Sequence, residues 1–350
     1  MVVRLRWASS IVPVKGTLAA AALMTMMVGC AHIERYHLDR QVVPKAETTP
    51  VPSDDDAADD PAIWVSPTNP AESLVIGTDK GSGLLSYTLD GQQFQYLPEG
   101  RVNNVDLRQQ PWGAQNMSIV VATQRGPSRL VLFTLDHETR KLELRARHET
   151  EILEPYGICL YQDANYIPYM IANGKDGTFV QYRIDQDYNI QVARRWQVAS
   201  QPEGCVANDQ THVVYVGEEA AGIWKLDARP KEPATLTNVD TTASGHLVAD
   251  VEGLALYHGS DTTYLVASSQ GDNSFAVYDT ATDQYQFSFH VVGNESIDGA
   301  SETDGLAITH QPLPGYPDGL LVVQDGYNLL PNEKQNFKFV SWQDVMRTAQ

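Results

Sequence analysis

Asp59-Asp60-Pro61-Ala62-Ile63-Trp64 sets the pattern of the whole chain, because a short acidic phrase of this kind occurs six times. Its copies occupy residues 59–64, 104–107, 154–158, 201–204, 250–254 and 302–306. The copies are spaced by about 46 to 52 residues, which is the period of a four-stranded propeller blade. The sequence therefore predicts an all-β fold, a six-bladed β-propeller with four antiparallel strands in each blade.

A ring of six blades would bring equivalent positions of the repeat together around one axis. Aligning the copies places five carboxylates and one tyrosine at such positions: Asp60, Asp106, Tyr156, Glu203, Glu252 and Asp304. Like charges are crowded together at low cost only when cations lie between them. We therefore expect a cation-binding centre on the axis of the ring.

A second repeat follows each acidic phrase and consists of a β-rich run, a polar break and another β-rich run. One slot after the first run holds, in chain order, Lys80, Arg125, Lys175, Glu219, Gln270 and Asp325. The first three blades would carry a cation at this slot, and the last three would not. In a ring, this difference predicts a basic arc that faces an acidic arc.

The chain has 350 residues and a formal net charge of −19 at pH 7. This charge argues against binding of nucleic acid or of an anionic membrane by the protein surface. It fits the binding of divalent cations, although an acidic surface also keeps exported proteins soluble. Because the carboxylates recur in register, we favour the cation-binding interpretation.

The sequence lacks the motifs of covalent catalysis and of zinc hydrolases. It contains no Gly-x-Ser-x-Gly elbow, no phosphate-binding Gly-x4-Gly-Lys loop and no His-Glu-x2-His pair. Oxygen ligands without His or Cys select Ca²⁺ or Mg²⁺, and Ca²⁺ suits a crowded carboxylate site. Phosphoryl transfer needs mainly positioning and charge neutralisation, which such ions and the basic arc would supply. A nearby carboxylate such as Glu219 would orient or deprotonate the attacking water.

The first 29 residues have the composition of a targeting signal, with a positively charged start and an apolar stretch at residues 17–28. The segment ends in Met27-Val28-Gly29-Cys30, which resembles the bacterial lipoprotein signal, where Cys30 would carry the lipid. We expect an exported protein that is held at the outer membrane through Cys30 or is released into the periplasm or the medium.

The rest of the chain is interpreted as a tether with a lead-in strand, residues 30–53, followed by the propeller domain, residues 54–347. A segment near residues 42–51 would supply the N-terminal strand that completes the last blade. Cys159 and Cys205 occupy nearly the same place in consecutive repeats. They would form either a disulfide between neighbouring inner strands or two small buried thiols.

These motifs together resemble those of the β-propeller phytases, a calcium-dependent class of phosphatases. The likeness spans residues 46–347 and is carried by residues 56–64, 103–106, 250–254, 268–271, 303–305 and 335–338. The resemblance implies a phosphoric monoester hydrolase of the 3-phytase type. Its substrate would be the calcium complex of phytate, myo-inositol hexakisphosphate, which a calcium-bound water would hydrolyse to lower inositol phosphates and inorganic phosphate.

The resemblance also implies roles for individual residues. The phosphate-binding and catalytic set would be Lys80, Arg125, Tyr156, Lys175 and Glu219. The calcium set would be Glu47, Asp59, Asp60, Asn103, Glu203, Asp250, Glu252, Gln270, Asp298 and Asp304. We expect several catalytic and stabilising Ca²⁺ ions, a monomer, and no membrane contact other than the anchor at Cys30.

Two other functions remain open at this point. A six-bladed calcium lactonase would share the acidic centre, but a neutral lactone needs no basic arc. A non-catalytic module would bind calcium or phosphorylated glycans with the same residues. The chain also departs from the family after Arg125, where Arg129 follows a short turn and adds a second cation.

Overall fold

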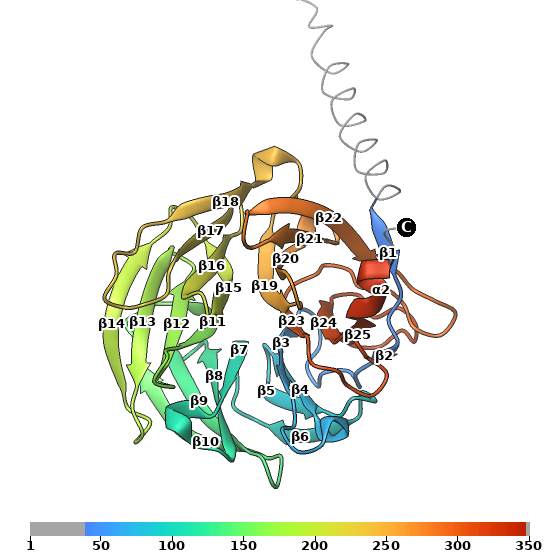
Figure 1. Ribbon diagram of the computed structural model, residues 1–350. Helices are drawn as coiled ribbons and strands as arrows, with labels where there is room; N and C mark the ends of the chain where they lie inside the picture. Colours follow the sequence, from blue (N-terminus) through green and yellow to red (C-terminus); the bar gives the residue numbers. More distant parts are fainter. Residues whose placement is uncertain (1–38, 348–350) are drawn as a thin grey trace, which may run out of the picture. The chain divides into compact units, whose positions relative to one another are not determined.

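The computed structural model describes residues 39–347, which form six β-sheets arranged in a ring (Figure 1). Five blades take their four strands consecutively from the chain, and the sixth combines three consecutive strands with one from the N-terminal segment. The predicted all-β, six-bladed propeller with four antiparallel strands in each blade is confirmed. The predicted targeting signal and Cys30 lie outside the described residues.

The strands of the first three blades follow one another from Ala58 to Gln197. Blade 1 contains β3 (Ala58–Trp64), β4 (Leu74–Asp79), β5 (Gly83–Tyr87) and β6 (Gln93–Leu97). Blade 2 contains β7 (Val102–Gln109), β8 (Met117–Gln124), β9 (Arg129–Asp136) and β10 (Leu142–Glu149). Blade 3 contains β11 (Pro155–Gln162), β12 (Pro168–Gly174), β13 (Thr178–Ile184) and β14 (Ile190–Gln197).

The remaining blades run from Pro202 to Ser341. Blade 4 contains β15 (Pro202–Asn208), β16 (Val213–Glu218), β17 (Gly222–Asp227) and β18 (Thr237–Thr241). Blade 5 contains β19 (Val251–His258), β20 (Thr263–Ser269), β21 (Ser274–Asp279) and β22 (Gln284–Val291). Blade 6 contains β23 (Leu306–Thr309), β24 (Leu320–Asp325) and β25 (Asn336–Ser341).

Helical structure in the described residues is confined to short elements. Four 3₁₀ turns occupy Pro70–Glu72, Pro111–Gly113, Thr242–Ser244 and Gln270–Asp272, and α2 (Trp342–Arg347) follows the last strand. None of these helices has the length and apolar character that a membrane crossing requires.

The N-terminal segment closes the ring. Strand β2 (Ala46–Glu47) pairs antiparallel with β25 and completes blade 6. The preceding strand, β1 (Arg40–Val42), pairs in parallel with β22 as a fifth strand of blade 5. The predicted closure by a segment near residues 42–51 is therefore confirmed, and two neighbouring blades are tied by the same stretch of chain.

The burial pattern of the strands explains why their sequences differ across a blade. All residues of β4 and β12 are buried, because neighbouring blades cover both faces of these strands. The outermost strand β10 instead alternates between buried or half-buried and exposed residues, as expected for a strand with one solvated face. Six apolar clusters form the core, one at each interface between adjacent blades.

A disulfide joins the inner strands of blades 3 and 4. Cys159 in β11 is bonded to Cys205 in β15, and their Cα atoms are 5.6 Å apart. Of the two readings of these cysteines that the sequence left open, the structure shows the disulfide.

Candidate active site and metal centre

A register shift at the start of the first strand of a blade determines which residue faces the axis. The shift separates Ala58 from Pro61 in β3, and the same irregularity recurs in β7, β11, β15 and β19. The extra residue is typical of a β-bulge. Counted from the shift, the ring positions are Asp59, Asn103, Tyr156, Glu203 and Glu252, with Asp304 before β23 as the sixth.

Glycines after the ring residues let neighbouring inner strands approach one another closely. A Cβ atom on Gly157 would lie 1.8 Å from the carbonyl oxygen of Glu203, and one on Gly204 would lie 2.1 Å from that of Glu252. Only glycine fits at such distances. The small residues therefore bring the ring side chains of adjacent blades together.

Asp60 and Asp106 were wrongly predicted as ring positions. Asp60 follows the ring residue Asp59, and its Oδ2 accepts a hydrogen bond from the backbone N–H of Val105 at 3.0 Å. Asp106 instead pairs with Arg108 at 3.0 Å, and both aspartates line a separate cavity of about 320 Å³. The error has a physical cause, because the bulge changes which residue of an acidic run belongs to the ring.

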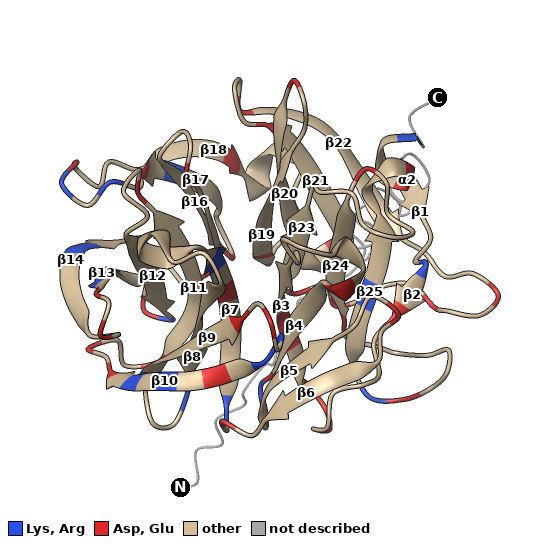
Figure 2. Ribbon diagram, turned by 60° about the horizontal axis from the view of Figure 1, so that its bottom comes forward, with Lys and Arg blue, Asp and Glu red and all other residues tan. Residues whose placement is uncertain are grey.

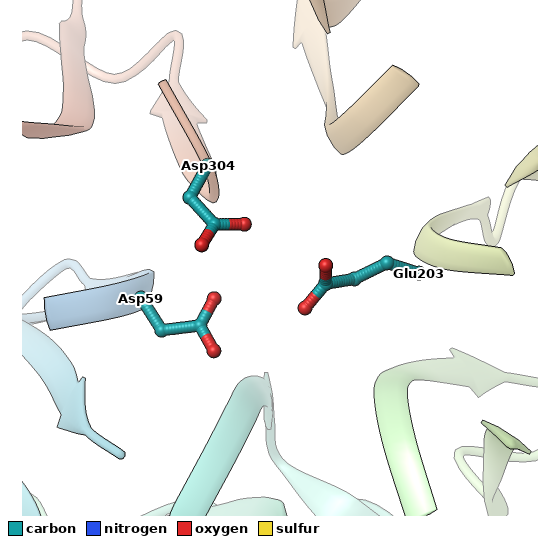
Figure 3. A group of neighbouring side chains, drawn as sticks. All are labelled: Asp59, Glu203 and Asp304. Carbon is teal, nitrogen blue, oxygen red and sulfur yellow. The ribbon is translucent and has the colours of Figure 1, made fainter. Parts of the chain in front are cut away.

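The ring carboxylates, together with Glu219, form two overlapping clusters. Oxygen atoms of Asp59, Glu203 and Asp304 lie within 4.8 Å of one another, and these three side chains point toward one another (Figure 3). Glu203, Glu219 and Glu252 form a second cluster of the same size, and all five residues are buried. Glu203 therefore belongs to both clusters.

Several of these oxygens lack a hydrogen-bond donor, although they are buried. Both carboxylate oxygens of Asp59, one oxygen each of Glu203 and Glu252, and Oδ1 of Asn103 have no hydrogen-bond partner in the described part of the chain. Leaving a buried polar atom unpaired is costly. A set of hard, orphaned oxygens at this spacing fits a divalent cation such as Ca²⁺, and no soft ligand is present.

The pKa values of the ring carboxyl groups also favour a bound cation. Burial, and then the charge of Asp304, raises the pKa of Asp59, Glu203 and Glu252 well above their ordinary ranges. Without a cation, the ring therefore favours protonated carboxyl groups. A metal ion would reverse this preference by stabilising the charged forms.

Among the lysines and arginines of the described residues, only Lys80 forms ion pairs with the ring. Its Nζ lies 2.5 Å from Asp56, 3.3 Å from Asp304 and 4.0 Å from Asp59. Burial alone would lower the pKa of Lys80, but the charges of Asp59 and Asp304 outweigh it and raise the pKa. Asp56 is an exposed loop residue that sequence reasoning did not single out as a partner.

The basic slot lies directly after the second strand of a blade. Lys80, Arg125 and Lys175 follow β4, β8 and β12, and Glu219 and Gln270 follow β16 and β20, as predicted. In blade 6 the slot holds Gly326, and the predicted Asp325 is the last residue of β24. Asp325 pairs with Lys338 at 3.2 Å, so its assignment to the slot was wrong by one residue.

Tyr156 lies between two cations of the arc. The Nζ atom of Lys175 is 4.2 Å from the centroid of the Tyr156 ring, and Cζ of Arg125 is 5.7 Å from it. Both distances are in the range of a cation–π contact. The structure therefore brings these three predicted residues together from blades 2 and 3.

Glu219 is held by a residue that the sequence did not reveal. Its Oε1 accepts a hydrogen bond of 2.6 Å from Nε2 of Gln201, which precedes β15. Burial raises the pKa of Glu219. The sequence does contain one indication of this contact, because Gln201 lies two residues before the ring position Glu203.

One cavity joins these groups. It has a volume of about 930 Å³, and its walls include Lys80, Tyr156, Glu219, Asp250, Glu252, Gln270 and Asp304. Figure 2 marks the positions of the acidic and basic residues along the ribbon. The predicted calcium residues Asp250 and Gln270 thus lie at the cavity, outside the ring itself.

Besides Asp60, which lines the separate cavity, two predicted calcium residues lie elsewhere. Glu47 and Asp298 each place a carboxylate oxygen 2.5 Å from Nζ of Lys338, which is fully buried. Asp325 joins them at 3.2 Å, and none of the three lines the cavity of the ring. The structure therefore gathers Glu47 and Asp298 around an ammonium group, and it does not bring them to the axis.

Comparisons with known proteins show which family the chain resembles. A family model described as Phytase matches residues 11–349. A 3-phytase of Bacillus subtilis (strain 168) is 37% identical over 355 residues, which cover 95% of this chain and 93% of that protein. Among solved structures, a functionally unknown protein from Desulfotomaculum acetoxidans DSM 771 shares 13% identity at a TM-score of 0.46, covering 65% of this chain and 70% of that one. A structural likeness at this level carries no argument.

Proposed function

The chain belongs to the phytase family, and we propose that it hydrolyses phytate to lower inositol phosphates and inorganic phosphate as a phosphoric monoester hydrolase of the 3-phytase type. The observation that carries the proposal is the single cavity in which a buried carboxylate ring meets a lysine of the basic arc and Tyr156. A substrate with many phosphates needs both cationic side chains and neutralised carboxylates close together.

We propose Ca²⁺ as the metal of the ring. Asp59, Glu203 and Asp304 would hold one ion, and Glu203, Glu219 and Glu252 would surround a second position. When bound, Ca²⁺ would neutralise the carboxylates, polarise phosphoryl oxygens and lower the pKa of water. The orphaned oxygens of the ring support this assignment.

The side chains of the arc would bind and orient the substrate. Arg125 and Lys175 reach toward Tyr156 from two blades, so a phosphate seated against the tyrosine would meet a cation on each side. Arg125 would bind two phosphate oxygens with its planar guanidinium group, and Lys175 would act as a point charge. Gln201 occupies Oε1 of Glu219, which leaves Oε2 to accept a proton from water.

The test is release of inorganic phosphate from phytate at neutral to mildly alkaline pH. We expect release in the presence of calcium and its loss when a chelator is added. Phosphorus NMR of the first product would show which phosphate is removed. If no phosphate is released under calcium, the proposed reaction is rejected.

The two alternative functions make different predictions. A non-catalytic phosphoglycan-binding module would bind anions through Lys175 and release no phosphate. A lactonase would open neutral lactones and would not respond to Lys175→Met. We prefer the phytase, because three cations at one repeated slot serve an anionic substrate.

We further propose that the protein is exported, with Cys30 as a lipid attachment site and the outer membrane as its location. The Cys159–Cys205 disulfide supports an oxidising compartment. Intact-mass measurement of the mature protein extracted from membranes tests the anchor, because an unmodified Cys30 at the N-terminus would reject it.

A further inference from the structure

The disulfide lies next to two residues of the site. Cys159 comes three residues after Tyr156 in β11, and Cys205 comes two residues after Glu203 in β15. In both strands the site residue lies within the register shift, and the cysteine lies in the regularly paired part of the strand that follows it. The bond therefore joins the two strand segments from which a proposed substrate ligand and a shared metal ligand project.

Few other bonds join these two segments. β11 and β15 belong to different sheets, so no β-ladder connects them. Asn173 bridges the strands, accepting from the backbone N–H of Gly157 at 2.9 Å and donating to the carbonyl oxygen of Glu203 at 2.8 Å. The disulfide is the one covalent link between blades 3 and 4 in the described residues, apart from the chain itself.

When no metal is bound, like charges repel one another around the segment that carries Glu203. The Glu203 carboxylate shares one cluster with Asp59 and Asp304 and another with Glu219 and Glu252. Repulsion among these groups acts to move β15 away from the axis, and calcium would remove it. A covalent bond between β11 and β15 opposes that movement.

We propose that the Cys159–Cys205 disulfide is a positioning element of the active site, holding Glu203 and Tyr156 in place while the ring is free of metal. The inference rests on the proposed calcium-dependent function. It assigns the disulfide a task that matters most before calcium binds. When the disulfide is removed, calcium binding must order the two strands as well as fill the ring, so the affinity for calcium falls.

The experiment compares the wild type with the double variant Cys159→Ala/Cys205→Ala. Thermal unfolding in calcium and in chelator, calcium titration with a competing fluorescent chelator, and phosphate release are measured. We expect the melting temperature to fall more in chelator than in calcium. We also expect the half-saturating calcium concentration to rise about three- to tenfold, with kcat at saturating calcium within about twofold of wild type.

A matched control is Gln181→Leu, which breaks another tie between the same two blades. Gln181 is buried in β13 and donates to the carbonyl oxygen of Ala228 at 2.8 Å, away from the ring. We expect this variant to lose similar stability with and without calcium and to keep its calcium midpoint. If the alanine pair does not fold, Cys159→Val/Cys205→Ala restores buried volume and is measured in its place.

Equal losses of melting temperature in calcium and in chelator, together with an unchanged calcium midpoint, would show a purely structural cross-link and overturn the inference. Failure of the proposed reaction is recognised separately. A wild type that binds calcium but releases no phosphate from phytate contradicts the function, and the unfolding and titration data still decide the role of the disulfide.

Discussion

Replacing Glu203 by glutamine is expected to stabilise the metal-free protein and to destabilise the calcium-loaded one. Glu203 belongs to both buried carboxylate clusters, and its Oε1 accepts a hydrogen bond of 2.9 Å from Asn103. Glutamine keeps this acceptor and removes the charge. In chelator the variant therefore loses repulsion, whereas in calcium it loses a charged ligand that two metal positions share.

The magnitude follows from the spacing of the ring. Two full charges 4.8 Å apart repel by about 3.5 kcal/mol at an effective dielectric constant of about 20. The metal-free ring relieves part of this cost by binding protons, because burial and Asp304 raise the pKa of Glu203. A net gain of about 2 to 3 kcal/mol for Glu203→Gln in chelator at pH 8 is expected.

The same raised pKa gives a pH dependence with a definite sign. Between the ordinary pKa of glutamate and the raised value, the folded state binds a proton that the unfolded state has lost. Stability of the metal-free wild type therefore falls as pH rises through this window, by up to about 1.4 kcal/mol per pH unit for each such group. Glutamine does not titrate, so the variant has a shallower slope.

The assay is calorimetric unfolding in chelator and in calcium at several pH values. A gain of about 2 to 3 kcal/mol corresponds to roughly 3 to 5 °C in melting temperature for a domain of this size. Glu218→Gln is the control, because Glu218 is buried outside the ring and is paired with Ser200 and Trp224. That variant should lose stability in both buffers. A Glu203→Gln protein that melts below wild type in chelator at pH 8 would refute the reasoning.

Three further predictions concern the cations and the proposed base. Arg125→Gln and Lys175→Met should each raise KM for phytate about tenfold, equivalent to about 1.4 kcal/mol, and leave calcium titrations unchanged. Glu219→Gln should lower kcat by about 10² to 10⁴ with little change in KM, which steady-state phosphate release will show. Lys338→Met should destabilise the protein in chelator by about 3 to 5 kcal/mol, because Glu47, Asp298 and Asp325 lose their counter-ion. If added calcium does not raise the melting temperature of this variant, that result contradicts a metal role for Glu47 and Asp298.

The sequence predicted the blades well, because a blade is a local unit with a fixed period. Lys80, Arg125 and Lys175 were placed correctly, since each directly follows a strand that pairs without interruption to the next turn. The position of a residue in a regular hairpin can be counted from the turn. Local counting therefore sufficed for the fold and for the basic arc.

The same counting failed where the backbone departs from regular pairing. Asp60 and Asp106 were counted as ring residues, but a register shift places Asp59 and Asn103 among the ring residues in their stead. The cluster of Glu47, Asp298 and Lys338 combines the first, fifth and last parts of the propeller. No repeat relates these segments, so only the three-dimensional closure of the ring reveals their ion pairs.

Lys80 lies where the carboxylate ring meets the basic arc, and its contacts separate its task from that of the other two cations. It is paired with three carboxylates, whereas Arg125 and Lys175 form no ion pair within 4.0 Å in the described residues and contact the Tyr156 ring. The charge of Lys80 is therefore largely committed to the ring, and the charges of Arg125 and Lys175 are available to phosphate. No Lys or Arg occurs between Lys231 and Lys334, so the strands from β19 to β24 carry no competing cation. A polyanion is thus drawn to blades 2 and 3 and meets the carboxylate ring from that side.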